Sequence, residues 1–323
     1  MTTEFEFIEN LRRRFNLTKI GDDCAVLPKD SKTDLVITTD LLVEDIDFKL
    51  EWSKPEFIGH KALAVSLSDV AAMGAKPVWS MLSIGIPQKI WKTDFVEKFY
   101  EGYMRLAKKF DVELIGGDVS KTPDKIVIDS IAAGEVKKGK AVLRSGAKVG
   151  DLIFVTGEIG GAAGGLKLLQ EGISYNSDGK TWQKYLLLKQ LQPFPKVFYS
   201  EFLSKNNLAT SMIDLSDGIS SDLAHICRAS KVGAKIYADE IPFDVKLKTI
   251  AKSFDEKIDY ALNGGEDFEL LFTANPKKYF RREKEFENHS FFCIGEITAN
   301  TEIIEFIADK KATILQRKGF RHF

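Results

Sequence analysis

Aspartates recur along this chain directly after short apolar runs or inside glycine-containing turns. Five such groups are Gly21-Asp22-Asp23, Thr38-Thr39-Asp40, Leu67-Ser68-Asp69, Gly116-Gly117-Asp118 and Asp214-Leu215-Ser216-Asp217-Gly218. One Asp at such a position is ordinary for a turn or a helix cap. Five of them favour a shared site for a hard cation, because carboxylate and hydroxyl oxygens suit Mg²⁺, which commonly bridges to substrate phosphates. The scarcity of His argues against zinc.

Glycine turns that open helices could also do chemistry, since their backbone N–H groups and the helix dipole attract phosphate. Two places fit, residues 157–165 and Asp217-Gly218. The first comes near a Walker A loop, but Leu166 stands where that loop needs Lys, and the spacing is not GxGxxG. Neither a P-loop nor a Rossmann site is therefore supported. For residues 157–165, glycine for tight helix packing is an equal alternative.

Two further polar positions leave both a functional and a structural interpretation open. Arg144 lies in a turn and is either a bidentate phosphate ligand or a solvated surface side chain. The run 264–267, with Glu266 near its end, is either a plain turn or part of a site. The histidines at positions 60, 225, 289 and 322 are scattered and suggest no triad, so we expect structural roles for them.

Hydrophobic periodicity predicts the elements that must position these residues in the first half of the chain. A buried strand is predicted at residues 35–39, and a helix begins at Ser53, with Pro55 and Glu56 forming a capping box, and ends at Gly74. Further strands are predicted at 78–87, 112–117 and 125–136, with a helix at 94–110 between the first two. This order predicts an α+β layer with one sheet face free to pack.

The turn-rich stretch 144–151 predicts a domain boundary, which gives domains 1–146 and 147–323. A length of 323 residues predicts two domains with two cores. After the boundary, predicted strands and helices alternate again, which favours a C-terminal α/β domain. Its strands are predicted at 152–157, 210–216, 234–238, 267–273 and 290–297, with helices at 158–170 and from 219, and an exposed loop at 172–182.

Composition excludes several classes of protein. Hydrophobic residues make up 44% and charged residues 29%, as in globular proteins. The net charge of -1 gives no field that would gather nucleic acid or an acidic membrane. The first 15 residues mix charges among apolar positions, so neither a signal peptide nor a membrane span is predicted. Three dispersed cysteines lack metal or disulfide spacing and predict a reduced, cytoplasmic protein.

Eight motifs follow one another along the chain: GDDCAVL, TTDLLVEDIDF, HKALAVSLSDVAAMGAKP, LIGGDVS, LRSGAKVGD, IDLSDGISSDL, NGGEDFELLFT and GFRHF. Together and in this order they resemble the bacterial thiamine-monophosphate kinases of the aminoimidazole ribonucleotide synthetase superfamily. The resemblance runs nearly end to end. It implies transfer of a phosphoryl group from ATP to thiamine monophosphate, several Mg²⁺ ions, and a homodimer in which the N-terminal sheets of two subunits pair into a barrel, with the nucleotide near that interface.

The same resemblance implies roles for individual residues. Asp118, Asp217 and Arg144 are implied as catalytic. Nucleotide contacts are implied for Gly117, Asp118, Arg144, Ser216 and Tyr100, and thiamine contacts for Glu266 and Phe320. Metal-binding positions are Asp23, Thr38, Thr39, Asp40, Asp69, Asp118, Asp214 and Asp217. One motif departs from the pattern, because Asp47 stands where relatives usually carry His. A carboxylate facing a cationic thiazolium is electrostatically reasonable there.

The chemistry of this reaction agrees with the residues. A phosphate acceptor is already ionised and needs no general base, which fits the lack of candidate His bases. Repulsion between two polyanions is the obstacle, and divalent ions with Arg144 would counter it. Two alternatives remain: a related ATP-dependent synthetase, which would want a reactive Cys, and a non-catalytic binding dimer. Acids beside Cys24 should raise its pKa, which weakens the first alternative.

Overall fold

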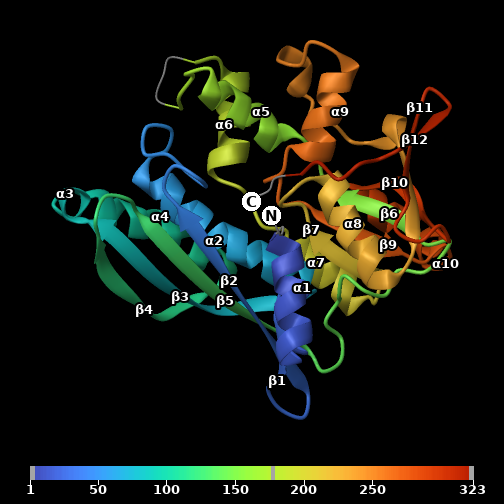
Figure 1. Cartoon of the computed structure of the whole chain (residues 1–323), viewed down its shortest axis with the longest axis horizontal. Coiled ribbons are helices and arrows are strands. Elements are labelled where there is room, and N and C mark those ends of the chain that lie inside the picture. The colour runs from blue at the N-terminus through green and yellow to red at the C-terminus, as the bar shows by residue number, and fades with distance from the viewer. Residues whose placement is uncertain (1–3, 176–178, 320–323) are drawn as a thin grey trace.

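A computed structural model describes residues 4–175 and 179–319 of the chain (Figure 1). Its first sheet has five strands in the order β1-β2-β5-β3-β4, and only the β3–β4 pair is parallel. The strands are β1 Ala25–Pro28, β2 Thr33–Val43, β3 Lys76–Pro87, β4 Glu113–Thr122 and β5 Val127–Lys137. Along β2, buried and partly exposed residues alternate, so one face of this sheet is covered and the other is not.

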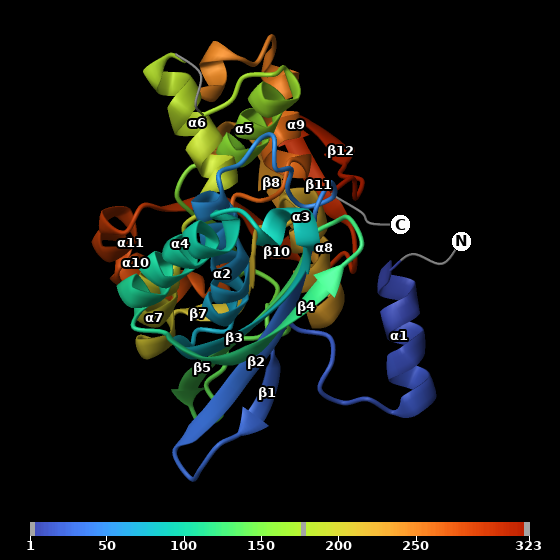
Figure 2. The ribbon, with the colours of Figure 1, turned by 90° about the vertical axis from the view of Figure 1, so that its left-hand side faces the viewer.

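Helices α2 (Pro55–Ala72) and α4 (Phe95–Phe110) cover one face of this sheet, as Figure 2 shows. They pack unusually closely. A Cβ atom on Gly59 would lie 1.9 Å from the carbonyl oxygen of Phe99, and one on Gly102 would lie 1.9 Å from that of Glu56. Both positions therefore require glycine, and this close approach fixes α2 against α4. A short helix, α3 (Gln88–Trp91), precedes α4.

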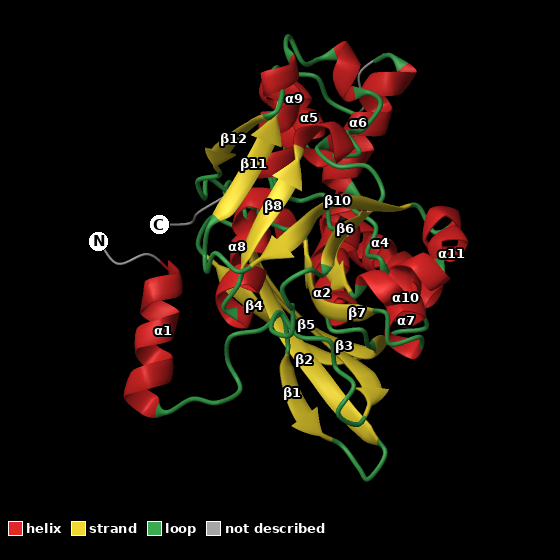
Figure 3. Ribbon diagram, turned by 90° about the vertical axis from the view of Figure 1, so that its right-hand side faces the viewer, coloured by secondary structure: helices red, strands yellow, loops and turns green. Residues whose placement is uncertain are grey.

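The first half differs from the sequence prediction in several local features. The strand predicted at 35–39 extends to Val43 and is buried on one face only. The predicted capping box at Ser53 is wrong, because Lys54 is the N-cap and the Ser53 hydroxyl contacts the Lys54 carbonyl oxygen instead. Strand β1 and helix α1 (Glu4–Phe15) were not predicted. Figure 3 shows α1 standing beside the body of the molecule.

The second sheet has seven strands in the order β12-β11-β8-β10-β6-β9-β7, and only β8 and β11 pair in parallel. The strands are β6 Leu152–Thr156, β7 Ala209–Asp214, β8 Gly233–Tyr237, β9 Leu270–Ala274, β10 Phe291–Thr298, β11 Ile304–Ala308 and β12 Lys311–Ile314. The alternation that predicted an α/β domain does not give a parallel sheet, because all but one of the strand pairs are antiparallel. The chain is a two-domain α+β protein with two mixed sheets.

Helices flank this second sheet, and in Figure 1 α5, α6 and α9 stand above it while α8 lies at its level. They are α5 Gly161–Gln170, α6 Thr181–Leu191, α7 Val197–Lys205, α8 Ile219–Ser230, α9 Phe254–Asn263, α10 Pro276–Arg281 and α11 Glu283–Asn288, with 3₁₀ turns at Ala238–Glu240 and Leu247–Thr249. The loop predicted at 172–182 lies partly outside the described residues, and its last two residues begin α6. In the described part of the chain, no helix is both long and apolar enough to cross a bilayer.

The expectation of one core for each domain is wrong. The largest apolar cluster joins residues of the first sheet, helices α2 and α4, and one face of the second sheet. Helix α2 is almost wholly buried because it contacts β2 and β5 on one side and β7 and α7 on the other. A second cluster packs on the opposite face of the second sheet. Residues on α2 therefore stand where both sheets meet, which is where the site forms.

Candidate active site

Three carboxylates from distant parts of the chain converge beside α2. One ligand oxygen from each of Asp23, Asp69 and Asp214 lies within 4.8 Å of the others. Asp23 precedes β1, Asp69 lies in the last turns of α2, and Asp214 ends β7. The helix predicted from Ser53 to Gly74 already contained Asp69, and α2 confirms it; grouping this acid with strand ends and turns is wrong. We call these three residues the acid cluster.

Hydroxyl groups hold the carboxylates of this region in place. Thr38 Oγ1 donates to Asp69 Oδ2 at 2.5 Å, and Ser68 Oγ donates to Asp214 Oδ2 at 2.6 Å. Nearby, Ser66 Oγ donates to Asp40 Oδ2 at 2.7 Å. Serines 66 and 68 lie on α2, so this one helix orients acids that come from both sheets.

Burial and mutual repulsion make it costly to ionise this group of acids together. Burial, followed by the charge of Asp23, raises the pKa of Asp214 to about 8. Burial and the charge of Asp40 raise the pKa of Asp69 well above its ordinary value. Burial also raises the pKa of Cys24, with smaller contributions from neighbouring acids, so the expected direction for this thiol is confirmed. A divalent cation would remove the repulsion.

Arg144 is the cation that the chain itself supplies to the acid cluster. Its Nη2 and Nε atoms donate to Asp23 Oδ1 at 2.6 and 3.2 Å, and its backbone N–H donates to the Asp22 carboxylate at 3.2 Å. The alternative of a solvated surface arginine is therefore wrong. Among the described residues, Asp23 Oδ2 is buried without a hydrogen-bond partner. A buried, unsatisfied oxygen beside two other carboxylates fits an oxygen-liganded cation such as Mg²⁺.

Mg²⁺ is expected to stabilise this protein more at pH 8 than at pH 6. The pKa values of Asp22 and Asp214 are raised to about 7 and about 8. The folded protein therefore binds more protons than the unfolded chain between roughly pH 4 and 8, and its free energy of unfolding falls as pH rises through that window. Mg²⁺ binding offsets this loss. Thermal unfolding midpoints with Mg²⁺ and with KCl of equal ionic strength test this; equal shifts at both pH values would contradict it.

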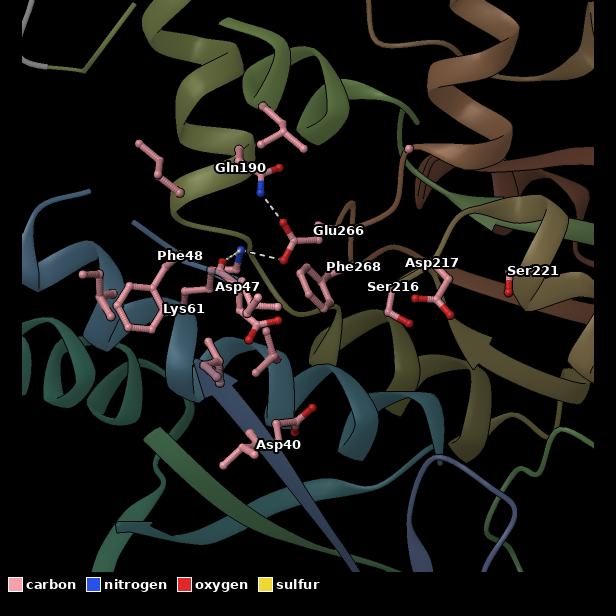
Figure 4. Close-up of a pocket in the computed structure, with 18 of the residues that line it drawn as sticks. Asp40, Asp47, Phe48, Lys61, Gln190, Ser216, Asp217, Ser221, Glu266 and Phe268 are labelled. Atoms are coloured by element: carbon pink, nitrogen blue, oxygen red, sulfur yellow. Dashed lines mark hydrogen bonds and ion pairs between the residues drawn. The ribbon is translucent and has the colours of Figure 1, made fainter. Parts of the chain in front are cut away.

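A cavity of about 960 Å³, which we call the central cleft, is lined by Arg144, the ion-pair partner of Asp23 in the acid cluster. Figure 4 shows part of the lining of this cleft. Both halves of the chain line it, which agrees with the size and position of many small-molecule sites. Six residues proposed from the sequence contribute to its wall. They are Asp40, Asp47, Arg144, Ser216, Asp217 and Glu266. Acids and hydroxyls are interspersed with aromatic rings in this lining, since Asp47 lies near Phe48 and Glu266 lies near Phe268 (Figure 4).

Glu266 is held at the cleft by two side chains that the sequence analysis missed. Lys61 Nζ lies 2.6 Å from Glu266 Oε1, and Gln190 donates to Oε2 (Figure 4). Lys61 is only 5% exposed, and its Nζ also donates to the backbone oxygen of Asp47. A lysine inside the apolar run that became α2 was the signal for this pair, because a buried charge needs a partner. Glu266 thus links the two halves of the chain.

The two glycine turns expected to bind phosphate are closed by the chain's own aspartates. At the start of α5, the backbone N–H groups of Gly160 and Ala162 donate to the Asp267 carboxylate at 2.6 and 3.0 Å. Before α8, the N–H groups of Asp217 and Gly218 donate to Asp222 Oδ2 at 3.2 and 3.0 Å. These four donors are therefore not available to a ligand, and phosphate binding through the other N–H groups of the two turns stays a prediction.

Several residues implied by the resemblance lie away from the acid cluster within one chain. Thr39 Oγ1 donates to Asp129 on the uncovered face of the first sheet, opposite Thr38. In the register of the sheet, Asp118 of β4 lies opposite Ser83 of β3, which in turn lies opposite Asp129 of β5. Asp118 therefore lies on that face too, on the edge strand that also carries Gly117. Tyr100 packs against the core from α4. Phe320 lies outside the described residues.

Both halves of the chain match one known protein family. The family description "AIR synthase related protein, N-terminal domain" matches residues 21–136, and "AIR synthase related protein, C-terminal domain" matches residues 148–306. The chain, with its two mixed sheets, is therefore an AIR synthase related protein.

Individual relatives narrow this class. The chain is 39% identical to the thiamine-monophosphate kinase of Buchnera aphidicola from Acyrthosiphon pisum, with 99% of each chain covered. It is 38% identical to that of Bacillus subtilis, with 94% of this chain and 93% of the relative covered. The solved structure named "AaThiL complexed with AMPPCP and TMP" matches with a TM-score of 0.88 and 31% identity over 99% of this chain and 97% of that one. The chain belongs to the thiamine-monophosphate kinase family, which confirms the resemblance.

Proposed function

We infer that this chain transfers the terminal phosphoryl group of ATP to thiamine monophosphate, giving thiamine diphosphate and ADP. Membership of the family supports the reaction, and the related structure in complex with AMPPCP and TMP supports ATP as co-substrate. The observation in this chain that carries the inference is the acid cluster, which Arg144 connects to a cleft large enough for two phosphorylated molecules.

The roles of individual residues are part of this proposal. We assign metal binding to Asp23, Thr38, Thr39, Asp40, Asp69, Asp118, Asp214 and Asp217, and nucleotide contacts to Gly117, Asp118, Arg144, Ser216 and Tyr100. Asp47, Glu266 and Phe320 are assigned to the thiamine moiety. For Asp47, the support is that its side chain lines the cleft. The backbone N–H of Val43 donates to Asp47 Oδ2 at 2.7 Å, which fixes the position of the carboxylate.

The mechanism requires positioning and charge neutralisation rather than proton abstraction. The acceptor phosphate oxygen is already ionised, so it attacks the γ-phosphorus of ATP directly, and ADP leaves with the electrons of the broken P–O bond. Arg144 stabilises the charge of the phosphates from a fixed position beside Asp23. The carboxylates of the acid cluster would hold Mg²⁺, which supplies further neutralisation of the transferred phosphoryl group. Glu266 would orient the cationic acceptor.

A dimer is proposed on the uncovered face of the first sheet. Leu41 is 61% exposed there, and Leu35, Ile37 and Ile131 are partly exposed beside it. Pairing this face with that of a second copy would bury apolar area and bring Asp118 to the interface, where the nucleotide is proposed to lie. The boundary between domains 1–146 and 147–323 is proposed at the turn before β6, and a cytoplasmic location stays a prediction.

Purified protein incubated with ATP, Mg²⁺ and thiamine monophosphate tests the function. We expect thiamine diphosphate and ADP in equal amounts, and no phosphorylated product from thiamine, because the acceptor is a phosphate oxygen. Nucleotide binding without turnover would favour a non-catalytic binding protein. Turnover with an aminoimidazole precursor instead of thiamine monophosphate would favour a related synthetase.

Replacing Glu266 by Gln is expected to raise the KM for thiamine monophosphate about 10- to 100-fold, because a charge-assisted contact to the cationic acceptor becomes neutral. The KM for ATP should change little. Glu171→Gln is a matched control, since that exposed acid at the end of α5 pairs with Lys167 and does not line the central cleft. Steady-state kinetics with each substrate varied in turn check the result. An equal rise in both KM values would argue against an acceptor-specific role.

A further inference from the structure

Glu266 has a backbone conformation that residues other than glycine rarely adopt. Its φ angle is 57°, in the left-handed region, and the preceding residue, Gly265, has a φ angle of 68°. The Glu266 backbone N–H donates to the Ser216 backbone oxygen at 2.8 Å, which ties this turn to the loop before α8. A glycine would adopt this conformation at less cost. The presence of Glu therefore indicates that its carboxylate is needed in the central cleft.

Three separate elements converge on this carboxylate (Figure 4). Lys61, from the first half of α2, and Gln190, from the last turn of α6, contact its two oxygens, and the turn that carries Glu266 follows α9. The Lys61 ammonium group also donates to the backbone oxygen of Asp47 at 3.3 Å. One buried cation therefore contacts two residues that we assign to the thiamine moiety, one from each half of the chain.

The glycine-rich start of α5 explains how Gln190 reaches the cleft. A Cβ atom on Gly165 would lie 2.2 Å from the backbone oxygen of Leu186 and 3.0 Å from the Cβ atom of Gln190. A larger residue at position 165 would push α6 away from α5 and move Gln190 relative to Glu266. Gly165 thus serves the tight packing of two helices, and this packing fixes the place of Gln190.

We propose that Lys61 and Gln190 are positioning residues, which fix the Glu266 carboxylate against the thiamine moiety and thereby set the affinity for the acceptor. This proposal rests on the proposed function, since it takes Glu266 to contact that moiety. Each carboxylate oxygen can accept a second hydrogen bond, so its two partners leave Glu266 able to contact the acceptor. A side chain that is already held in place loses less conformational entropy on binding than a free one.

Steady-state kinetics of K61M, with each substrate varied in turn, test the proposal. We expect the KM for thiamine monophosphate to rise about 10-fold, while kcat and the KM for ATP change less than about twofold. The Glu266 side chain is 32% exposed, so water can solvate its carboxylate after the substitution and the fold should survive. Q190M should raise the same KM by a smaller factor, and it keeps the test valid if K61M folds poorly.

A double-mutant cycle with Glu266→Ala shows whether Lys61 acts through Glu266. In the E266A background, K61M should raise the KM for thiamine monophosphate less than about twofold further, because the side chain that Lys61 positions is already gone. A lysine with a purely structural role would give the same factor in both backgrounds. Full additivity of the two substitutions would therefore overturn the proposal.

Lys196→Met is the matched control, because Lys196 pairs with the buried Glu269 at 2.8 Å and does not line the central cleft. Breaking this ion pair should lower thermal stability and leave the KM for thiamine monophosphate unchanged. K61M and Q190M with the same KM as this control would count against a positioning role.

Calorimetric titration with thiamine monophosphate separates this proposal from the proposed function. If the wild-type protein binds this molecule without turnover, and K61M binds it about 10-fold more weakly, the positioning role stands and the reaction fails. If the wild-type protein turns over and K61M binds with wild-type affinity, the reaction stands and the positioning role fails. No binding to the wild-type protein would contradict both.

Discussion

Asp214→Asn is expected to lower turnover on the order of 10²- to 10³-fold, because the acid cluster loses one of the charges that would hold Mg²⁺ against the phosphates. The same substitution should stabilise the metal-free protein at pH 8. Burial and Asp23 raise the pKa of Asp214 to about 8, so an ionised carboxylate is disfavoured in the folded state. An amide can still accept the hydrogen bond from Ser68. The substitution is therefore expected to lower turnover while it raises the stability of the metal-free protein.

The measurement is kcat at saturating Mg²⁺, with thermal unfolding midpoints at pH 6 and pH 8 in the absence of metal. Asp34→Asn is the matched control, because Asp34 is also buried and accepts the backbone N–H of Gly139 at 2.7 Å, away from the central cleft. We expect that control to keep near-normal turnover. If Asp214→Asn keeps turnover within about threefold of the wild-type value, the assigned metal role is wrong.

Arg144→Gln is expected to lower turnover on the order of 10²-fold and to destabilise the protein more at pH 8 than at pH 6. Arg144 contributes to lowering the pKa values of Asp22 and Asp214, so its loss raises both further. The folded protein then holds additional protons, and its free energy of unfolding falls more steeply as pH rises. Asp23 is also left buried without its ion-pair partner.

Unfolding midpoints at the two pH values and kcat measured with excess Mg²⁺ check this result. Lys148→Gln is the control, since Lys148 is an exposed cation in the same turn before β6. Arg144→Lys should recover part of the stability but less of the turnover, because lysine keeps the charge and loses the planar donor geometry. A deficit in stability that is equal at pH 6 and pH 8 would show that Arg144 does not act through the acids.

The placement of acids in the chain predicted much of the site. The prediction did not say which of two adjacent strand residues points toward the site. Asp23, Asp69 and Asp214 were chosen because acids recur near apolar runs, and all three meet. Thr38 and Thr39 were both proposed as metal-binding positions. Residues that are adjacent in a strand point to opposite faces, so only Thr38 reaches the acid cluster. The buried strand predicted at 35–39 hid this alternation, because a strand covered on both faces shows none.

Contacts between distant segments explain most of what the sequence analysis missed. Asp267 closes the turn before α5 from more than 100 positions away, and no local pattern reveals such a partner. Asp222 closes the turn before α8 from within the first turn of that helix, where an acidic residue is a usual cap and could have been found. The expectation of two cores failed because α2 is apolar almost all round, which is the pattern of a helix buried between two layers.

Anomalous diffraction from crystals grown with Mn²⁺, an ATP analogue and thiamine monophosphate tests the central claim most directly. Mn²⁺ takes the same oxygen ligands as Mg²⁺ and can be located without ambiguity. We predict a strong peak within coordination distance of Asp23, Asp69 or Asp214 and of a phosphate oxygen, with both substrates in the central cleft. Phosphates bound in the cleft with no peak at these three carboxylates would contradict the account.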